Sequence, residues 1–304
     1  MIIDAHTHIF ERAPGSPVAG AGVRRGFPRD AAFRLEALLD EMDRATVERA
    51  VLLQGPYYGE ANAYVLDSVR RHPQRLLAAA CVDPWEQGRD EITALLQGSP
   101  FRALKLECSE PTGLFGCHPA ATLADPDLRW LWDLLADLGL VLTVDLGTPG
   151  SRSYQTGALR QIADEHPGLK IVVAHLGQPP RAGSGGHGLR TRWEEQIELG
   201  RLPNVWFDCA ALPAYFADEG YPYPSAGRWL RVAMDRIGPG KVMWGSDIPG
   251  LLRHATYPQL VAMAGLHAAF LAPADRARFL SGTARRVYWN ETAESAESVD
   301  EAGC

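Results

Sequence analysis

Two histidines stand two positions apart near the start of the chain, in the apolar stretch Ile2 to Phe10. If this stretch is an extended strand, His6 and His8 leave it on the same face, with Cα atoms roughly 6.5 to 7 Å apart. Two imidazoles at that separation can reach one metal ion. The alternative is a pair of buried histidines that stay neutral and find other partners. We expect ligation, because the strand would direct both rings into the interior of the protein.

A catalytic metal site needs at least three protein ligands and one open position, so further groups must come from other parts of the chain. Asp247 ends an apolar run, and a carboxylate there can bind the ion and accept a proton from water. Its other interpretation, the N-cap of a following helix, is weakened by Pro249 and Gly250. His175 ends another apolar run, and we expect it to act as a ligand or as a catalytic acid or base.

Eight short runs rich in Val, Ile and Leu recur along the chain, alternating with stretches whose apolar residues have helical spacing. The expected strands are Ile2 to Phe10, Arg49 to Gln54, Leu76 to Val82, Ala103 to Cys108, Leu140 to Leu146, Lys170 to Leu176, Val205 to Ala210, and Lys241 to Asp247. A last helix, Pro273 to Trp289, is expected to seal the barrel that these strands would form.

This alternation predicts an α/β fold, a single-domain (β/α)₈ TIM barrel over residues 1–290, followed by a flexible acidic tail over residues 291–304. The rival is an open sheet that binds a dinucleotide, which should show the pattern GxGxxG after its first strand. The glycines at 20–26 have the wrong spacing for that pattern. We therefore expect a barrel, with its active site at the carboxyl ends of the strands.

Composition excludes several classes of function. The formal net charge is −7, but the last fourteen residues hold five acidic and no basic side chains, which leaves −2 for the rest. Without a basic cluster we expect no nucleic-acid partner. The five cysteines never form a CxxC pair, and no apolar run is long enough to span a membrane. We expect a cytoplasmic protein with a small-molecule substrate and no membrane partner, compatible with a homodimer.

Four segments together resemble the amidohydrolase superfamily, in the amidohydrolase-2 branch that includes aminocarboxymuconate-semialdehyde decarboxylase, related aromatic-acid decarboxylases and sugar or pyrone lactonases. They are His6-x-His8, Ala174-His175-Leu176-Gly177, Trp244-Gly245-Ser246-Asp247 and Gly282-Thr283-Ala284-Arg285-Arg286-Val287. The resemblance covers residues 2 to about 289 in order and spacing. It implies that His6, His8 and Asp247 bind one divalent metal ion, with zinc expected and manganese as the alternative. It also implies that His175 is catalytic.

The chain departs from this branch at the tip of the fifth strand, where relatives usually carry a metal-binding histidine and this chain has Asp145. Asp145 shares the inward parity of Val141 and Thr143, and a carboxylate can ligate zinc or manganese in place of imidazole. We expect the metal to be retained with Asp145 as a ligand, and loss of the metal is the alternative.

Lys105 is one of only three lysines, against 27 arginines, and shares one strand face with Glu107. Inside a barrel its amine could meet the substrate or Asp145, or it could form a buried ion pair with Glu107. Trp85 is expected to add an apolar wall to the substrate pocket.

Three arginines are candidates to hold a substrate carboxylate, because a guanidinium group matches it with two hydrogen bonds. They are Arg152, Arg181 and Arg253, and solvated surface arginine is the alternative for each. The loops at 11–33 and 178–191 are expected to cover the substrate.

These features predict a metal-dependent hydrolase acting on an amide, a lactone or a similar carbonyl compound. Asp247 would accept a proton from water that the metal acidifies, and His175 would stabilise or protonate the leaving side. One alternative is non-oxidative decarboxylation of a carboxylated substrate at the same site. The other is a non-catalytic binding barrel that has lost its metal.

Overall fold

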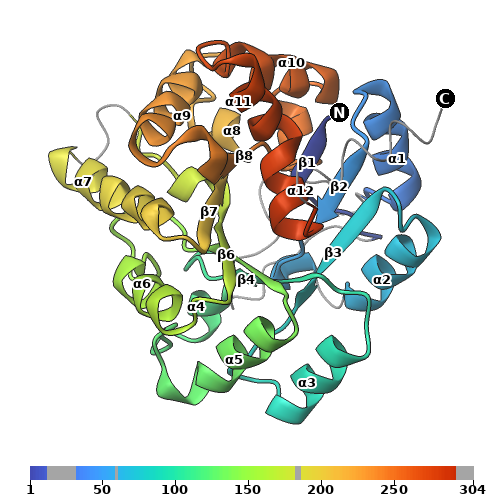
Figure 1. The fold of residues 1–304 in the computed structure, drawn as a ribbon, viewed down its shortest axis with the longest axis vertical. Coiled ribbons are helices and arrows are strands. Elements are labelled where there is room, and N and C mark those ends of the chain that lie inside the picture. The colour runs from blue at the N-terminus through green and yellow to red at the C-terminus, as the bar shows by residue number, and fades with distance from the viewer. Residues whose placement is uncertain (12–31, 59–60, 182–185, 292–304) are drawn as a thin grey trace.

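Eight parallel strands pair in chain order and form a barrel, as the sequence predicted (Figure 1). The computed structural model of the chain describes residues 1–11, 32–58, 61–181 and 186–291. The strands are β1 (Ile3–Thr7), β2 (Arg49–Leu52), β3 (Leu76–Cys81), β4 (Ala103–Glu107), β5 (Val141–Asp145), β6 (Lys170–Val173), β7 (Val205–Asp208) and β8 (Val242–Met243). All eight lie within the stretches expected from the sequence.

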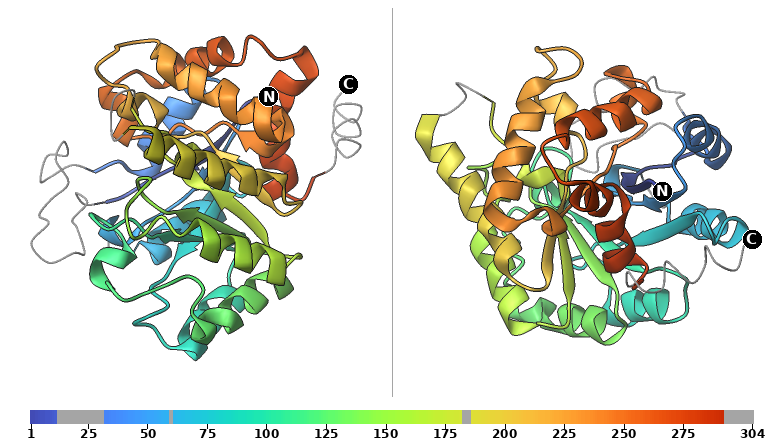
Figure 2. Two further views of the ribbon diagram at one scale, coloured as in Figure 1. Left: turned by 90° about the vertical axis from the view of Figure 1, so that its left-hand side faces the viewer. Right: turned by 45° about the horizontal axis from the view of Figure 1, so that its top comes forward.

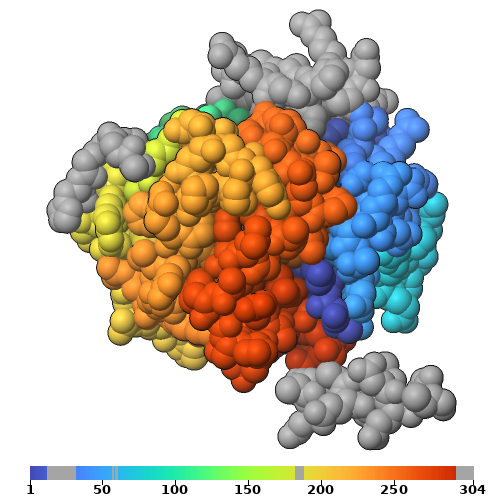
Figure 3. Space-filling view, turned by 90° about the horizontal axis from the view of Figure 1, so that it is seen from above, coloured from blue at the N-terminus to red at the C-terminus, as the bar shows by residue number. Residues whose placement is uncertain are grey.

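Backbone hydrogen bonds close the ring between the first strand and the chain after β8. The amide of Ala5 donates to the carbonyl of Trp244 at 3.0 Å, and the amide of Asp247 donates to the carbonyl of His6 at 2.8 Å. In Figure 3 the blue start of the chain accordingly lies beside the orange and red atoms of its last third. Closure therefore places the first strand next to the segment that carries Asp247.

Helices surround the strands, as the views in Figures 1 and 2 show. They are α1 (Leu35–Arg44), α2 (Asn62–Arg71), α3 (Arg89–Gln97), α4 (Leu114–Cys117), α5 (Arg129–Asp137), α6 (Thr156–Glu165), α7 (Gly186–Ile197), α8 (Leu212–Tyr215), α9 (Pro224–Ile237), α10 (Tyr257–His267), α11 (Pro273–Ala277) and α12 (Thr283–Tyr288). Their buried apolar side chains pack on the outer face of the barrel, which is how a parallel sheet covers both of its faces. Among the described residues, no helix has the length and apolar character that a membrane span needs.

The C-terminal helix seals the amino-terminal end of the barrel, as expected. The predicted segment Pro273 to Trp289 forms α11 and α12, joined by a π-helical turn over Arg278–Gly282. Ala284, Val287 and Tyr288 of α12 belong to the apolar cluster inside the barrel, and the hydroxyl of Tyr288 lies 2.9 Å from Oγ1 of Thr143. The site of chemistry must therefore lie at the opposite, carboxyl end.

Two predictions concern residues that the structure does not describe. The acidic tail was placed at 291–304, and only Glu291, paired with Arg49 and Arg285, lies within the described residues. The covering loops were placed at 11–33 and 178–191, of which 12–31 and 182–185 lie outside the described residues.

Candidate active site

A shift of register in β1 turns both early histidines into the mouth of the barrel. Ile3 and Ala5 point into its interior cluster, and the pairing of β1 with β2 shifts between Asp4 and Thr7. Such a bulge re-aims the side chains that follow it. His6 and His8 consequently both line the cavity at the carboxyl end, with ring centroids 5.1 Å apart.

His175 and Asp247 lie beyond the ends of their strands, which corrects the predicted strands Lys170 to Leu176 and Lys241 to Asp247. β6 ends at Val173 and β8 ends at Met243. His175 and Asp247 have φ angles of 58° and 63°, in the left-handed region that a strand ladder does not allow. Residues other than glycine in this region are enriched at active sites, and the side chains of His175 and Asp247 both line the cavity at the barrel mouth.

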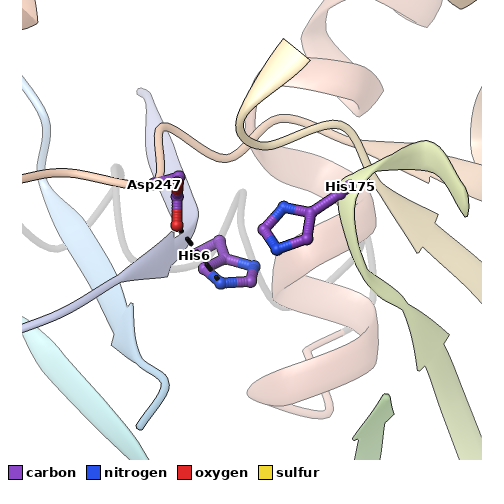
Figure 4. A group of neighbouring side chains, drawn as sticks. All are labelled: His6, His175 and Asp247. Atoms are coloured by element: carbon purple, nitrogen blue, oxygen red, sulfur yellow. Dashed lines mark ion pairs between the residues drawn. The ribbon is translucent and has the colours of Figure 1, made fainter. Parts of the chain in front are cut away.

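Three side chains from different parts of the barrel meet at this point: His6, His175 and Asp247 (Figure 4). Each offers one atom able to bind a metal, and these atoms lie within 4.8 Å of one another. Nε2 of His6 is 3.8 Å from Oδ1 of Asp247, and the rings of His6 and His175 have centroids 4.6 Å apart. No other such group of three or more histidine, cysteine or acidic side chains occurs in the described part of the chain.

The hydrogen bonds made by the Nδ1 atoms of His6 and His8 determine which nitrogen of each ring carries the proton. Nδ1 of His8 contacts the carbonyl oxygen of Leu53, which can only accept, so this nitrogen donates. Nδ1 of His6 lies 3.0 Å from the carboxylate of Asp208 and donates in the same way. Both Nε2 atoms are therefore acceptors when the rings are neutral.

These two acceptors face a third acceptor. Nε2 of His8 is 2.9 Å from Oδ1 of Asp247, and the buried Nε2 of His6 has no hydrogen-bond partner. Acceptors that converge in this way need a shared proton or a cation between them, and two imidazole nitrogens with one carboxylate oxygen form a common donor set for a divalent metal. The residues present fit such an ion.

The protonation states follow from burial and neighbouring charge. Burial lowers the pKa of His6 to about 4 and also lowers the pKa of His8, so both rings are neutral at pH 7. Burial would raise the pKa of Asp247, but its contact with His8 and the positive charge of His175 hold that pKa below the usual value. Neutral imidazoles and an ionised carboxylate are the forms that bind metal.

His175 differs from the other two histidines. Burial alone would lower the pKa of His175, but the surrounding carboxylates, Asp145 foremost, raise it to about 9. Nε2 of His175 lies 3.4 Å from Oδ2 of Asp145. Oδ1 of Asp145 accepts from the amide of Gly147 at 2.8 Å and from Nε2 of Gln178 at 2.9 Å. Asp145 thus contacts the cluster of His6, His175 and Asp247 through His175, and its predicted role as a metal ligand stays a prediction.

A cavity of about 260 Å³ opens above the cluster. Its lining includes His6, His8, His175, Asp247 and Asp145, and also Gly55, Lys105, Glu107, Ser109, Pro111, Thr112, Gly147, Thr148, Gln178, Ala211, Ala214, Tyr215, Gly250, Leu251 and Arg253.

Lys105 lines the cavity and also lies close to Glu107, as the sequence predicted. Nζ of Lys105 is 4.0 Å from Oε2 of Glu107. Burial, with the charge of Asp145, raises the pKa of Glu107 to about 7.

The three candidate arginines occupy different positions. Arg253 lines the cavity, whereas Arg152 and Arg181 are not among its lining residues. Nε of Arg152 is 2.9 Å from Oε1 of Glu110. Nε of Arg181 donates to the carbonyl of Tyr215 at 2.7 Å.

Trp85 also lies away from the lining of the cavity. Its ring packs against Phe115 and His118, with ring centroids 5.4 and 5.7 Å apart. Its expected contact with substrate stays a prediction.

Sequence reasoning missed two buried carboxylates that support the site. Asp208, at the end of β7, bonds to His6 and to the backbone of His175. Asp4, in β1, accepts from the hydroxyl of Tyr257 at 2.6 Å and from the amide of Ser246 at 2.9 Å. Asp208 could have been found, because a polar residue at the carboxyl tip of a barrel strand usually belongs to the active site. Asp4 gives no such signal, since it lies near the start of its strand.

A family model described as amidohydrolase (Amidohydro_2) matches residues 3–289. The chain belongs to the amidohydrolase family. This confirms the resemblance seen in the four sequence segments, and with it the prediction of a metal-dependent hydrolase. The L-fucono-1,5-lactonase of Burkholderia ambifaria is 27% identical over 310 residues, covering 94% of each chain.

Solved structures share the fold of this amidohydrolase. An amidohydrolase from Burkholderia multivorans with bound zinc has a TM-score of 0.76 at 21% identity, covering 95% of this chain and 99% of that one. A probable 2-pyrone-4,6-dicarboxylic acid hydrolase from Acinetobacter baumannii, with citric acid bound, has a TM-score of 0.74 at 17% identity, with the same coverage. At these identities the likeness establishes the barrel and leaves the substrate open.

Proposed function

We propose that this amidohydrolase hydrolyses a small-molecule lactone in the cavity above His6, His8, His175 and Asp247. The observation that carries the proposal is the convergence of three acceptor atoms, Nε2 of His6, Nε2 of His8 and Oδ1 of Asp247, without a donor between them. A lactone is favoured among carbonyl substrates because the similar proteins are named for a lactone and for a 2-pyrone, which are both cyclic esters.

His6, His8 and Asp247 are the ligands we propose for one divalent ion, with Asp145 as a further candidate behind His175. Zinc suits this mixture of nitrogen and oxygen donors, and manganese is the alternative. When bound, the ion would polarise the ester carbonyl and lower the pKa of nearby water.

Two residues of the chain would move protons. Lactone hydrolysis joins the oxygen of water to the acyl carbon and breaks the bond from that carbon to the ring oxygen. Asp247 is placed to take the proton that water loses, and His175, held protonated by Asp145, is placed to give a proton to the departing ring oxygen. The product is then a hydroxy acid, and the cycle closes when the proton gained by Asp247 is returned to His175.

Arg253 and Lys105 support the prediction that the substrate carries a carboxylate. Both cations line the cavity, and Nε of Arg253 donates to Nε2 of His254 at 3.1 Å. We propose Arg253 for the carboxylate because a guanidinium group can form paired hydrogen bonds with it, which the ammonium group of Lys105 cannot.

The test is a panel of carboxylated and uncharged lactones, assayed by acid release before and after dialysis against a chelator. We expect one equivalent of acid for each lactone consumed, loss of turnover after chelation, and recovery with zinc or manganese. Release of carbon dioxide from a carboxylated ring, without lactone opening, would replace the proposal by the decarboxylase alternative.

Metal content gives an independent check. A His6→Ala, His8→Ala double variant should lose the metal that elemental analysis finds in the wild type. The matched control is His166→Ala, which removes a buried histidine paired with Asp133 at 3.0 Å, away from the cavity. Equal metal content in the wild type and the double variant would remove the proposed site and favour a non-catalytic barrel.

A further inference from the structure

Asp208 lies between two of the cluster histidines and is completely buried at the end of β7. Its Oδ1 accepts from the backbone amide of His175 at 2.9 Å and from the amide of Ala210 at 3.0 Å. Its Oδ2 lies 3.0 Å from Nδ1 of His6. One carboxylate therefore joins strands β1 and β7 to the turn that follows β6.

The two hydrogen bonds from backbone amides determine that Asp208 accepts, and does not donate, a hydrogen bond at the ring of His6. Backbone amides can only donate, so Oδ1 of Asp208 must accept, and a carboxylate that accepts several N–H groups is favoured in its ionised form. Oδ2 then also accepts, and Nδ1 of His6 must carry the proton. Nε2 of His6 is left with its lone pair toward Asp247, at 3.8 Å from Oδ1.

The same carboxylate also braces the turn that carries His175. His175 and Leu176 adopt consecutive left-handed conformations, with φ angles of 58° and 51°. Two adjacent residues other than glycine in this region are strained, and strain of this kind persists only where the surroundings hold it. The bond from the amide of His175 to Asp208 is one such restraint.

We propose that Asp208 is a positioning residue of the metal site, which fixes the Nδ1–H tautomer of His6 and so presents the Nε2 lone pair to the ion. The inference rests on the metal site of the proposed function. Carboxylates that hold a ligating histidine in this way commonly change metal affinity by 10- to 100-fold when they are replaced.

Asp208→Asn is the informative variant because asparagine has the shape of aspartate but donates a hydrogen bond to Nδ1 of His6 where aspartate accepts one. The amides of His175 and Ala210 require the single carbonyl oxygen of asparagine on their side. The amide NH₂ then faces Nδ1 of His6, which must become an acceptor, and the ring proton moves to Nε2. A proton on Nε2 blocks the lone pair that the ion would use.

Asp4→Asn is the matched control. Asp4 is equally buried and also joins β1 to a neighbouring segment, but its contacts are to the hydroxyl of Tyr257 and to the amides of His6 and Ser246, not to a cluster ring. If Asp208 only stabilises the fold, the two variants should lose similar zinc affinity. If Asp208 fixes the tautomer of His6, only Asp208→Asn should lose affinity and change the tautomer.

The experiment measures zinc affinity by competition with a chelator, and the tautomer of His6 by ¹⁵N NMR of the histidine rings in the metal-free protein. We expect Asp208→Asn to lose roughly 10- to 100-fold in affinity and to show Nε2–H at His6. Asp4→Asn should keep the wild-type tautomer and most of the affinity. Equal losses of affinity in both variants, or wild-type affinity with Nδ1–H in Asp208→Asn, would overturn the proposal.

The wild-type protein alone can also test the proposal, and metal binding can be separated from lactone hydrolysis. If Asp208→Asn does not fold, the wild-type spectrum alone decides, because Nε2–H at His6 in the wild type contradicts the proposal. None of these measurements uses a lactone. A wild-type protein that opens no lactone, yet binds zinc in a manner that depends on Asp208, would contradict only the proposed reaction.

Discussion

Nε2 of His8 lies 2.9 Å from Oδ1 of Asp247, although these residues are 239 positions apart in the chain. The contact exists because the barrel closes between β1 and the segment after β8, and it joins two of the proposed ligands. Asp247 is therefore both a proposed ligand of the metal and the candidate proton acceptor. Changing its charge should affect chemistry far more than folding.

Asp247→Asn should lower kcat/KM for a lactone by roughly 10² to 10⁴-fold, the usual contribution of a general base. The substituted amide has the same shape and can still bond to His8, so the midpoint of thermal unfolding should stay close to that of the wild type. Steady-state kinetics and a melting curve by circular dichroism measure both quantities. Near-normal turnover in this variant would show that Asp247 is not the base.

Gly245→Ala should disturb the site through packing alone. A Cβ atom at position 245 would lie 2.8 Å from Cβ of His6 and 3.2 Å from Cβ of Ala210, and neither neighbour can rotate away. Overpacking of this kind costs about 1 to 3 kcal/mol in the free energy of unfolding and should also reduce metal content. Gly265→Ala is the control, since a Cβ there meets nothing within 4 Å and position 265 lies in α10. Urea unfolding that gives equal stability for both variants would contradict the packing argument.

The pair of His175 and Asp145 should make the stability of the metal-free protein depend on pH. Burial opposes the charge of His175, but Asp145 and the other carboxylates raise its pKa from 6.5 to about 9 in the folded state. The raised pKa stabilises the fold fully below about pH 6.5, and this contribution is lost as the pH rises through about 9.

Asp145→Asn should remove that dependence, because the pKa of His175 then falls and the folded state no longer binds the extra proton. The measurement is the free energy of unfolding in urea between pH 6 and pH 10, in the presence of a chelator. An equally steep decline in the variant would show that another group is responsible.

Arg253→Met should weaken binding of a carboxylated lactone without affecting an uncharged one. A hydrogen bond to a charged group contributes about 1.5 to 3 kcal/mol, so KM for the carboxylated lactone should rise roughly 10- to 100-fold. Arg152→Met provides the control, since Arg152 pairs with Glu110 and does not line the cavity. If both lactones lose affinity equally in Arg253→Met, the role of Arg253 is not charge recognition.

Several features of this protein could be predicted from local patterns. The alternation of apolar runs and helical spacing predicted all eight strands, because burial on both faces requires continuous Val, Ile and Leu. His6, His8, His175 and Asp247 could be selected because polar residues at the carboxyl tips of barrel strands converge on one mouth. The resemblance to the amidohydrolase family rested on the same residues and was confirmed by the family match.

The tertiary structure alone decided how these residues meet. The strands were predicted too long at His175 and Asp247, because a left-handed turn in a residue other than glycine is held by contacts distant in sequence. One such contact, Asp208 to the amide of His175, spans 33 positions, and the bond of Asp208 to His6 spans 202. The sequence by itself determined which chemical groups reach the barrel mouth. Their orientation, protonation and partners depend on strands that become neighbours only when the ring closes.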